Sequence, residues 1–326
     1  GVSDAFTAND TFGQNLSVAM CGNYTINASI GASTTNFTSF TSAVNMLSAA
    51  GVSCPVTFTV AANTYSEQIS IPSILGASAT STITFDGGTG NAATRIMSFS
   101  PASTANYIVQ LNGASWIRFR NLTLTNTNAT YGTVVNYYNN ASSDSFQSVV
   151  MNSPSTTSTS TNNAIVFTPS SPVTVSNDMV FNQCTLNNGA YGFYNYSSST
   201  NLLGASSQRF TVSNCTLTNQ YYMGIQNQYT DGINILNNTI TTNSTYTAYN
   251  GLYCYWVMVL SDQNKTTIKG NRITGGQGGF GMYLYYLGVN SSVTTPRRYL
   301  VADNYIQIGA STNTTVGLYD NYGNGV

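Results

Sequence analysis

The stretch Phe119-Arg-Asn-Leu-Thr-Leu-Thr125 decides the fold, because the chain returns to the same pattern again and again. Each copy has an apolar residue, a small polar pair that often contains Asn, and then an Ile or Leu followed by a polar residue. Further copies begin at Phe181, Val212, Ile235, Ile268 and Val301, and a degenerate copy begins at Phe146. Their starts lie 23 to 35 residues apart. Repeats of roughly 20 to 50 residues are typical of solenoids, so a solenoid is the predicted architecture.

The order of polar and apolar residues inside the repeat predicts how each coil is built. Short strands separated by Asn and Gly, two or three in each repeat, are typical of a parallel β-helix. We therefore expect an all-β, right-handed parallel β-helix of about nine or ten coils. The leading apolar residue should point inward, and Asn at the bend tolerates left-handed backbone geometry. Asn238, Asn271 and Asn304 share one repeat position, so their side chains are expected to stack as an amide ladder.

A single convincing helix is expected near residues 37–50, before the repeats begin. Gly51 is a suitable end for it, and its apolar residues fall at helical spacing: Phe37, Phe40, Val44 and Leu47. Because a solenoid exposes its core at the first coil, an amphipathic helix in this place is expected to cap that end. We divide the chain into a lead-in with the capping helix over residues 1–52 and a β-helix over residues 53–326.

Five cysteines leave at least one without a partner inside the chain. Cys184 and Cys215 share one repeat position, and adjacent strands lie about 4.8 Å apart. That spacing is compatible with a disulfide, but it equally suits two small apolar residues buried in a column. Cys21 and Cys54 flank the N-terminal segment and are the second candidate pair, able to staple the cap.

Charge is scarce, since Asp, Glu, Lys and Arg make up only 6% of the chain, against about 25% in ordinary globular proteins. The net charge is −1 and the nine basic residues are scattered, whereas nucleic-acid binding needs a cationic surface. No apolar run approaches the length of a membrane-spanning helix. We expect no nucleic-acid partner, no membrane insertion and no cofactor. The expected location is extracellular or at the cell surface, with the signal sequence already removed.

A second phrase, Gly, an apolar residue and then Tyr-x-Tyr, recurs in the C-terminal half, as in Gly251-Leu-Tyr-Cys-Tyr255 and Gly281-Met-Tyr-Leu-Tyr285. If the residue after Gly points inward, alternation along the strand turns the tyrosines outward. The candidate interaction surface comprises Tyr194, Tyr196, Tyr253, Tyr255, Tyr283, Tyr285 and Tyr319. Its chemistry suits stacking on glycans or lateral packing against another protein, and the preference of tyrosine for strands would also account for it.

The segment from Phe37 to Phe85 resembles the N-terminal cap and first coils of right-handed parallel β-helix proteins. It is most similar to large secreted surface proteins of gliding, Bacteroidota-type bacteria, within the wider pectin-lyase-like superfamily. The resemblance implies the fold over nearly the whole chain. It implies no single activity, because that superfamily includes polysaccharide lyases, hydrolases and esterases as well as non-catalytic adhesins.

Catalytic groups are not evident in the sequence. The chain has no His, which removes the commonest acid–base side chain. The ten acidic residues are dispersed, and Asp144, Asp178 and Asp231 are the ones that stacking could bring to one turn, although Asp at such places usually forms the turn itself. We predict no catalytic, metal-binding or cofactor-binding residue.

Taken together, these features favour a non-enzymatic structural or adhesive surface protein, either a filament or surface-layer subunit or part of a larger adhesin. Its partners would be further copies of itself or other surface proteins, with glycans as an additional class. The first alternative is a carbohydrate-active enzyme or glycan-binding module of the pectin-lyase-like type. The second alternative is an ice-binding protein, suggested by outward Thr-x-Thr pairs, although Thr is also a common residue of exposed strands.

Overall fold

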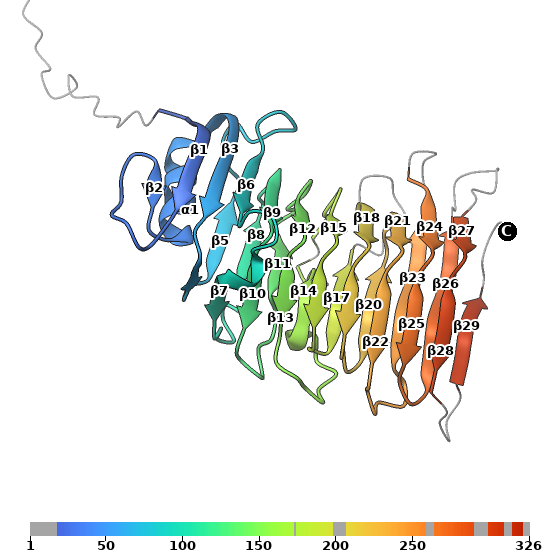
Figure 1. Cartoon of the computed structure of the whole chain (residues 1–326). Coiled ribbons are helices and arrows are strands. Elements are labelled where there is room, and N and C mark those ends of the chain that lie inside the picture. The colour runs from blue at the N-terminus through green and yellow to red at the C-terminus, as the bar shows by residue number, and fades with distance from the viewer. Residues whose placement is uncertain are drawn as a thin grey trace, which may run out of the picture.

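Short parallel strands stack along one axis in three sheets, which we call columns (Figure 1). The computed structural model describes residues 18–172, 174–197, 207–258, 264–289, 299–309 and 315–321. Each turn of the chain visits the first, second and third column in that order and then moves up by one strand. The predicted all-β, right-handed parallel β-helix is confirmed.

The strands of the three columns have the following bounds. The first column holds β1 (Met20–Ile26), β3 (Val52–Val60), β6 (Ile83–Asp86), β9 (Ile117–Arg120), β12 (Ser145–Gln147), β15 (Val180–Asn182), β18 (Gln208–Ser213), β21 (Asp231–Leu236), β24 (Thr266–Lys269) and β27 (Tyr299–Ala302). The second holds β4 (Asn63–Tyr65), β7 (Arg95–Phe99), β10 (Thr123–Asn126), β13 (Val150–Asn152), β16 (Thr185–Asn187), β19 (Thr216–Thr218), β22 (Thr239–Thr242), β25 (Arg272–Gly275) and β28 (Tyr305–Ile308). The third holds β5 (Ile69–Pro72), β8 (Val109–Asn112), β11 (Val135–Tyr138), β14 (Ala164–Phe167), β17 (Tyr191–Tyr196), β20 (Met223–Gln228), β23 (Asn250–Met258), β26 (Gly279–Val289) and β29 (Thr315–Asn321).

The first repeated phrase is the corner between the first and second columns. In Phe119–Thr125, β9 ends at Arg120, the chain bends at Asn121 with φ 53°, and β10 begins at Thr123. The matching residue of the other copies also has positive φ: Ser148, Gln183, Asn214, Asn237, Gly270 and Asp303. Asn, Asp and Gly are the residues that adopt this left-handed conformation most readily, which explains their recurrence at the corner.

Inside the coils, the leading residue of each phrase packs on its counterpart in the next turn. Phe58, Phe85, Phe119, Phe146 and Phe181 form one continuous stack, with ring centroids 5.0–5.2 Å apart between neighbours and interplanar angles of 4–16°. All five rings are fully buried. The parallel in-register strands impose this spacing, because they place identical positions one strand apart.

An amide ladder continues the interior three positions after the leading residue of the repeat, as predicted. The Asn238 side-chain NH₂ donates to Oδ1 of Asn271 at 2.9 Å, and the Asn271 NH₂ donates to Oδ1 of Asn304 at 2.9 Å. The same NH₂ groups also donate to carbonyls of the preceding turn, at Val212 and Ile235. Each buried amide is thereby paired on both sides, which removes the penalty for burying it.

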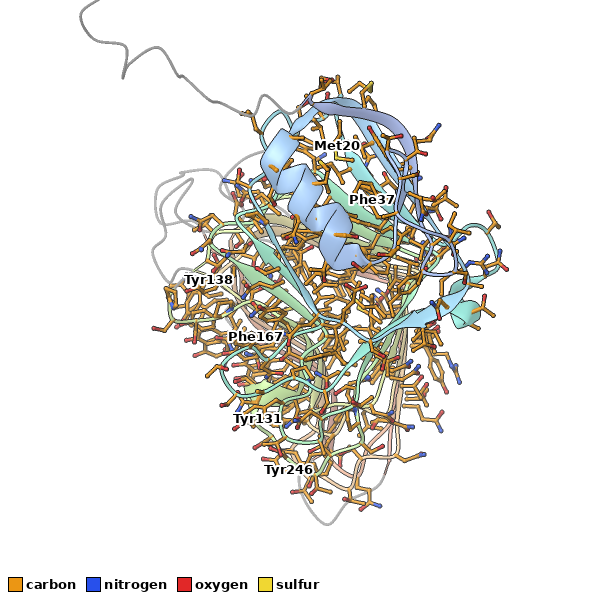
Figure 2. The ribbon with its side chains drawn as sticks, turned by 90° about the vertical axis from the view of Figure 1, so that its left-hand side faces the viewer. Met20, Phe37, Tyr131, Tyr138, Phe167 and Tyr246 are labelled. Carbon is orange, nitrogen blue, oxygen red and sulfur yellow. A yellow bond between two sulfur atoms is a disulfide. The ribbon has the colours of Figure 1, made fainter. Side chains whose placement is uncertain are left out.

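Helix α1 (Phe40–Ala50) lies across the first coil, and Figure 2 looks along the axis from this end. Ser39 caps its start by a reciprocal capping box with Ser42, and the N–H of Gly51 donates to the Leu47 carbonyl at its end. Glu67 accepts hydrogen bonds from the backbone N–H groups of Phe40 and Thr41 at 2.9 and 2.8 Å. A carboxylate in this place satisfies free N–H groups and complements the positive end of the helix dipole. The short strand β2 (Asn36–Phe37) precedes the helix, and two 3₁₀ turns occur elsewhere, η2 (Ala92–Thr94) and η3 (Thr161–Asn163).

The cysteines follow two different patterns. Cys21 and Cys54 are joined by a disulfide between β1 and β3. Cys184 and Cys215 are free and buried, as is Cys254. Cys184 and Cys215 stand in the same interior column as the amide ladder, where they act as small apolar residues.

Asp144 is an acidic side chain enclosed in the core. It is 0% exposed, its Oδ1 accepts the backbone N–H of Ile117 at 2.8 Å, and its Oδ2 has no hydrogen-bond partner among the described residues. Burial raises the pKa of this carboxyl well above its usual range, against the opposing effect of the Ile117 hydrogen bond. The folded protein therefore holds a proton that the unfolded chain releases above about pH 4.

Replacement of Asp144 by Asn is expected to remove a pH-dependent destabilisation. The contribution of the protonated carboxyl to stability is complete below the unfolded-state pKa and falls as pH rises towards the folded-state pKa, by up to about 1.4 kcal/mol per pH unit. In urea unfolding between pH 4 and pH 7, the wild type should therefore lose stability relative to Asp144→Asn as pH rises. Asp303→Asn, at an exposed carboxylate, is the control. A difference that stays constant over this range would contradict the assignment.

Candidate functional site

The seven tyrosines of the predicted surface all lie on the outer face of the third column. They belong to β17, β23, β26 and β29 and form two rows that run along the axis. The residues that alternate with them point inward, and Phe193, Leu252 and Met282 are fully buried. The strand period of two thus sends the apolar residue into the core and the tyrosines to the surface. Phe167 lies one turn before Tyr194 in the same row, and Figure 2 shows it on this flank of the molecule.

Within each row the rings stack face to face from turn to turn. In the row nearer the start of each strand, the ring centroids of Tyr253 and Tyr283 are 5.0 Å apart, and those of Tyr283 and Tyr319 are 4.9 Å apart. In the other row, Tyr255 and Tyr285 are 5.3 Å apart with an interplanar angle of 6°. The outer face of the C-terminal coils is therefore an ordered aromatic surface.

Sequence reasoning missed two further groups of aromatic side chains that border these rows. The first lies before the strands or at their starts: Tyr191, Tyr222, Tyr246 and Phe280. The second lies at the corner into the first column: Tyr229, Trp256 and Tyr286. The signal for the second group was present, because Trp256 and Tyr286 directly follow the Tyr-x-Tyr phrase.

The three corner aromatics adopt an unusual backbone conformation. Tyr229, Trp256 and Tyr286 have φ of 56°, 54° and 54°. At the corresponding corners of earlier turns the chain has Gly113 and Asn139, residues that favour positive φ. Bulky side chains are uncommon there, and such strain concentrates at functional sites. The corner therefore extends the aromatic surface at a conformational cost.

A hollow of about 480 Å³ opens at β20, where both rows of tyrosines are interrupted. The register places Gln226 of β20 between Tyr194 and Tyr253, and Gln228 between Tyr196 and Tyr255. We call this hollow the aromatic groove. Its lining consists of Thr161, Tyr191, Tyr194, Tyr222, Met223, Gln226, Gln228, Ala248, Asn250, Tyr253, Phe280 and Tyr283.

Every side chain that lines the aromatic groove is uncharged. Burial is the largest cause that raises the pKa of Tyr191, Tyr194, Tyr222 and Tyr253 above the usual value of tyrosine. These phenols therefore stay protonated through the physiological pH range and can donate as well as accept hydrogen bonds. The groove combines flat apolar rings with neutral hydroxyl and amide groups.

The nearest described charged network lies beyond the corner, just after Tyr229. Asp178 forms a two-point ion pair with Arg209, with N–O distances of 2.5 and 2.8 Å. Arg209 also donates to Asn264 at 3.0 Å, and Asn264 donates to the buried Asp231 at 2.6 Å. Asp144 lies apart from this network in the core, so only two of the three aspartates considered from the sequence come together. Among the described residues, no group of three His, Cys, Asp or Glu side chains is arranged to hold a metal ion.

Comparison with known proteins gives a fold and no close relative. No protein-family model and no curated protein sequence matches the chain. A pectin methylesterase from Aspergillus niger is similar in structure, with a TM-score of 0.54 and 13% identity over 95% of this chain and 92% of that one. A rice weevil pectin methyl esterase has a TM-score of 0.49 with 12% identity over 88% of both chains. A GH136 lacto-N-biosidase from Eubacterium ramulus has a TM-score of 0.44 with 10% identity, covering 88% of this chain and 68% of that one.

The fold is therefore a right-handed parallel β-helix, as in the Aspergillus niger pectin methylesterase. The comparisons also correct the leading functional prediction. A non-enzymatic adhesive or filament-forming protein is contradicted, because the Aspergillus niger pectin methylesterase that shares this fold is an enzyme. The prediction erred by giving the missing His and dispersed acids more weight than the fold. At 13% identity, the likeness itself establishes the fold and no substrate.

Proposed function

We propose that this chain is a carbohydrate-active protein that binds a glycan in the aromatic groove. The observation that carries the proposal is the groove itself, in which six of the twelve lining residues are Tyr or Phe. Ligand sites typically combine apolar and aromatic walls with a few polar groups that fix the orientation of the ligand. A sugar ring presents the same combination, with C–H groups on its faces and hydroxyls around its edge.

The polar groups of the groove are suited to sugar hydroxyls. Gln226, Gln228 and Asn250 each offer an amide carbonyl and an NH₂ group, and Thr161 offers a hydroxyl. Phenol groups of the surrounding tyrosines add further donors. A pectin methylesterase shares the fold of this chain, which is in keeping with a glycan ligand.

An extracellular location is part of the proposal. The disulfide between Cys21 and Cys54 is of the kind that persists in oxidising compartments. No helix in the described part of the chain has the length and apolar character needed to cross a bilayer. We also propose a bacterial surface or secreted origin of the Bacteroidota type, on the resemblance of the segment from Phe37 to Phe85.

Replacement of Tyr253 by Ala is expected to weaken glycan binding about tenfold, since loss of one stacking partner corresponds to roughly 1.4 kcal/mol. Binding is measured by affinity electrophoresis against soluble polysaccharides and then by calorimetry with the best ligand. Tyr305→Ala is the matched control, because Tyr305 is an exposed tyrosine on the second column. The proposal fails if the wild type binds no polysaccharide, or if the control weakens binding as much as Tyr253→Ala.

A further inference from the structure

We propose that the groove holds a single uncharged hexopyranose unit in a slot between the rings of Tyr194 and Tyr253, above Gln226. This inference rests on the proposed glycan binding and specifies its place and ligand class. It follows from which ring faces the stacking leaves open, from the width of the gap and from the neutral lining.

Several tyrosine faces on this surface are covered by another ring. Tyr283 stacks on Tyr253 on one side and on Tyr319 on the other. Phe167 lies against Tyr194 from the preceding turn, with centroids 5.5 Å apart. A ligand that meets the stacked part of the surface therefore contacts ring edges and hydroxyls. At β20 no ring lies in register between Tyr194 and Tyr253, and both tyrosines line the groove.

The width of this interruption matches one ring. Tyr194 and Tyr253 are two strands apart, with Gln226 in register between them, which corresponds to about 9.6 Å. Stacked rings favour centroid separations of about 4.5 to 7 Å. A ring placed midway would lie about 4.8 Å from each tyrosine, the spacing at which the same column already stacks Tyr283 on Tyr253. The side chain of Gln226 fills the base of this gap, so a pyranose chair would lie over its amide with one tyrosine on either side.

Two features close the slot on its other sides. Gln226 is only 5% exposed and forms the floor. In the second row the equivalent gap is narrower, because Tyr229 lies edge-on to Tyr196 at 5.3 Å and to Tyr255 at 5.7 Å, and Gln228 lines the groove on that side. The slot therefore narrows towards the corner and takes one sugar unit, with the rest of the glycan outside it.

The lining selects an uncharged sugar. None of its twelve residues carries a charge, and transfer of a carboxylate from water into such a site without a cation is strongly unfavourable. The floor and rim instead present the amides of Gln226 and Asn250, which suit hydroxyl groups. The expected ligand is a neutral hexopyranose such as a glucose or galactose unit, in preference to a uronate.

The decisive variant is Gln226→Tyr, which fills the slot by completing the tyrosine row. Because Tyr is the residue at this register in four other turns, the fold should accept it, with a melting temperature equal to or above that of the wild type. Binding should fall at least tenfold. Gln110→Tyr makes the same substitution at the same position of the column on β8, far from the groove, and should leave binding unchanged. Tyr194→Val removes one wall and tests the slot independently if Gln226→Tyr does not fold.

The probes are hexasaccharides of glucose, galactose and mannose together with hexagalacturonate, titrated by calorimetry at pH 7. Binding of a neutral hexasaccharide that is lost in Gln226→Tyr and kept in Gln110→Tyr supports the slot. Unchanged binding by Gln226→Tyr and Tyr194→Val overturns the slot and leaves glycan binding standing. Hexagalacturonate bound as tightly as the best neutral ligand overturns the ligand class. No binding of any polysaccharide or hexasaccharide by the wild type overturns the proposed function itself.

Discussion

Replacement of Asn271 by Leu is expected to lower the free energy of unfolding by about 4 kcal/mol. Leucine has a suitable size, since Leu122 holds the same repeat position in an earlier turn and is buried. The expected loss of stability comes from the hydrogen bonds that Leu cannot form. Asn271 Oδ1 accepts from the backbone N–H of Asn238 at 3.0 Å and from its side chain at 2.9 Å. Asn271 Nδ2 donates to the Ile235 carbonyl at 2.8 Å.

These partners are buried and have no access to water to replace the lost bonds. Each buried polar group left unpaired costs about 1 to 3 kcal/mol, so two or three such groups give the stated total. Urea unfolding followed by circular dichroism measures the change. Asn187→Leu is the control, because Asn187 lies on the outer face of the second column and bonds to Asn152 across that surface. A loss below about 1 kcal/mol for Asn271→Leu would show that the ladder contributes little.

Replacement of Phe146 by Ala is expected to destabilise the fold by about 3 to 5 kcal/mol. Phe146 is fully buried in the middle of the phenylalanine stack, 5.2 Å from Phe119 and 5.1 Å from Phe181. The strands on either side fix the spacing of the coils, so the neighbouring rings cannot close the cavity that truncation leaves.

The measurement for Phe146→Ala is again urea unfolding, with Phe167→Ala as a partly exposed control from the third column. We expect the control to lose clearly less stability, because Phe167 is only partly buried. Equal losses at the two positions would contradict the claim that the interior stack is the main support of these coils.

The phrase Phe119–Thr125 predicted the solenoid correctly for a physical reason. A parallel β-helix places the same repeat position in the same column in every turn. Each copy therefore requires an inward apolar residue, a left-handed bend and a second inward residue. The amide ladder of Asn238, Asn271 and Asn304 was predictable on the same ground.

The sequence predicted only some of the residues that form the aromatic groove and its border. Alternation along β17, β23 and β26 predicts that their tyrosines face outward. It does not predict Tyr191 or Tyr222 at the border, nor Tyr229 at the corner, because these residues lie outside the repeated phrase. The functional prediction was wrong for a different reason, since it gave the missing His and the dispersed acids more weight than the fold, which is shared with a pectin methylesterase.

The amino-acid sequence by itself determined the coil, because repetition along the chain becomes stacking along the axis. It also determined which tyrosines leave the core, through the period of two in a strand. Only the tertiary structure decided which ring faces remain open. That depends on the register between β17, β20 and β23, which places Gln226 between Tyr194 and Tyr253 although the three residues lie 32 and 27 positions apart in the chain. The gap at Gln226 therefore appears only when the three strands lie next to one another.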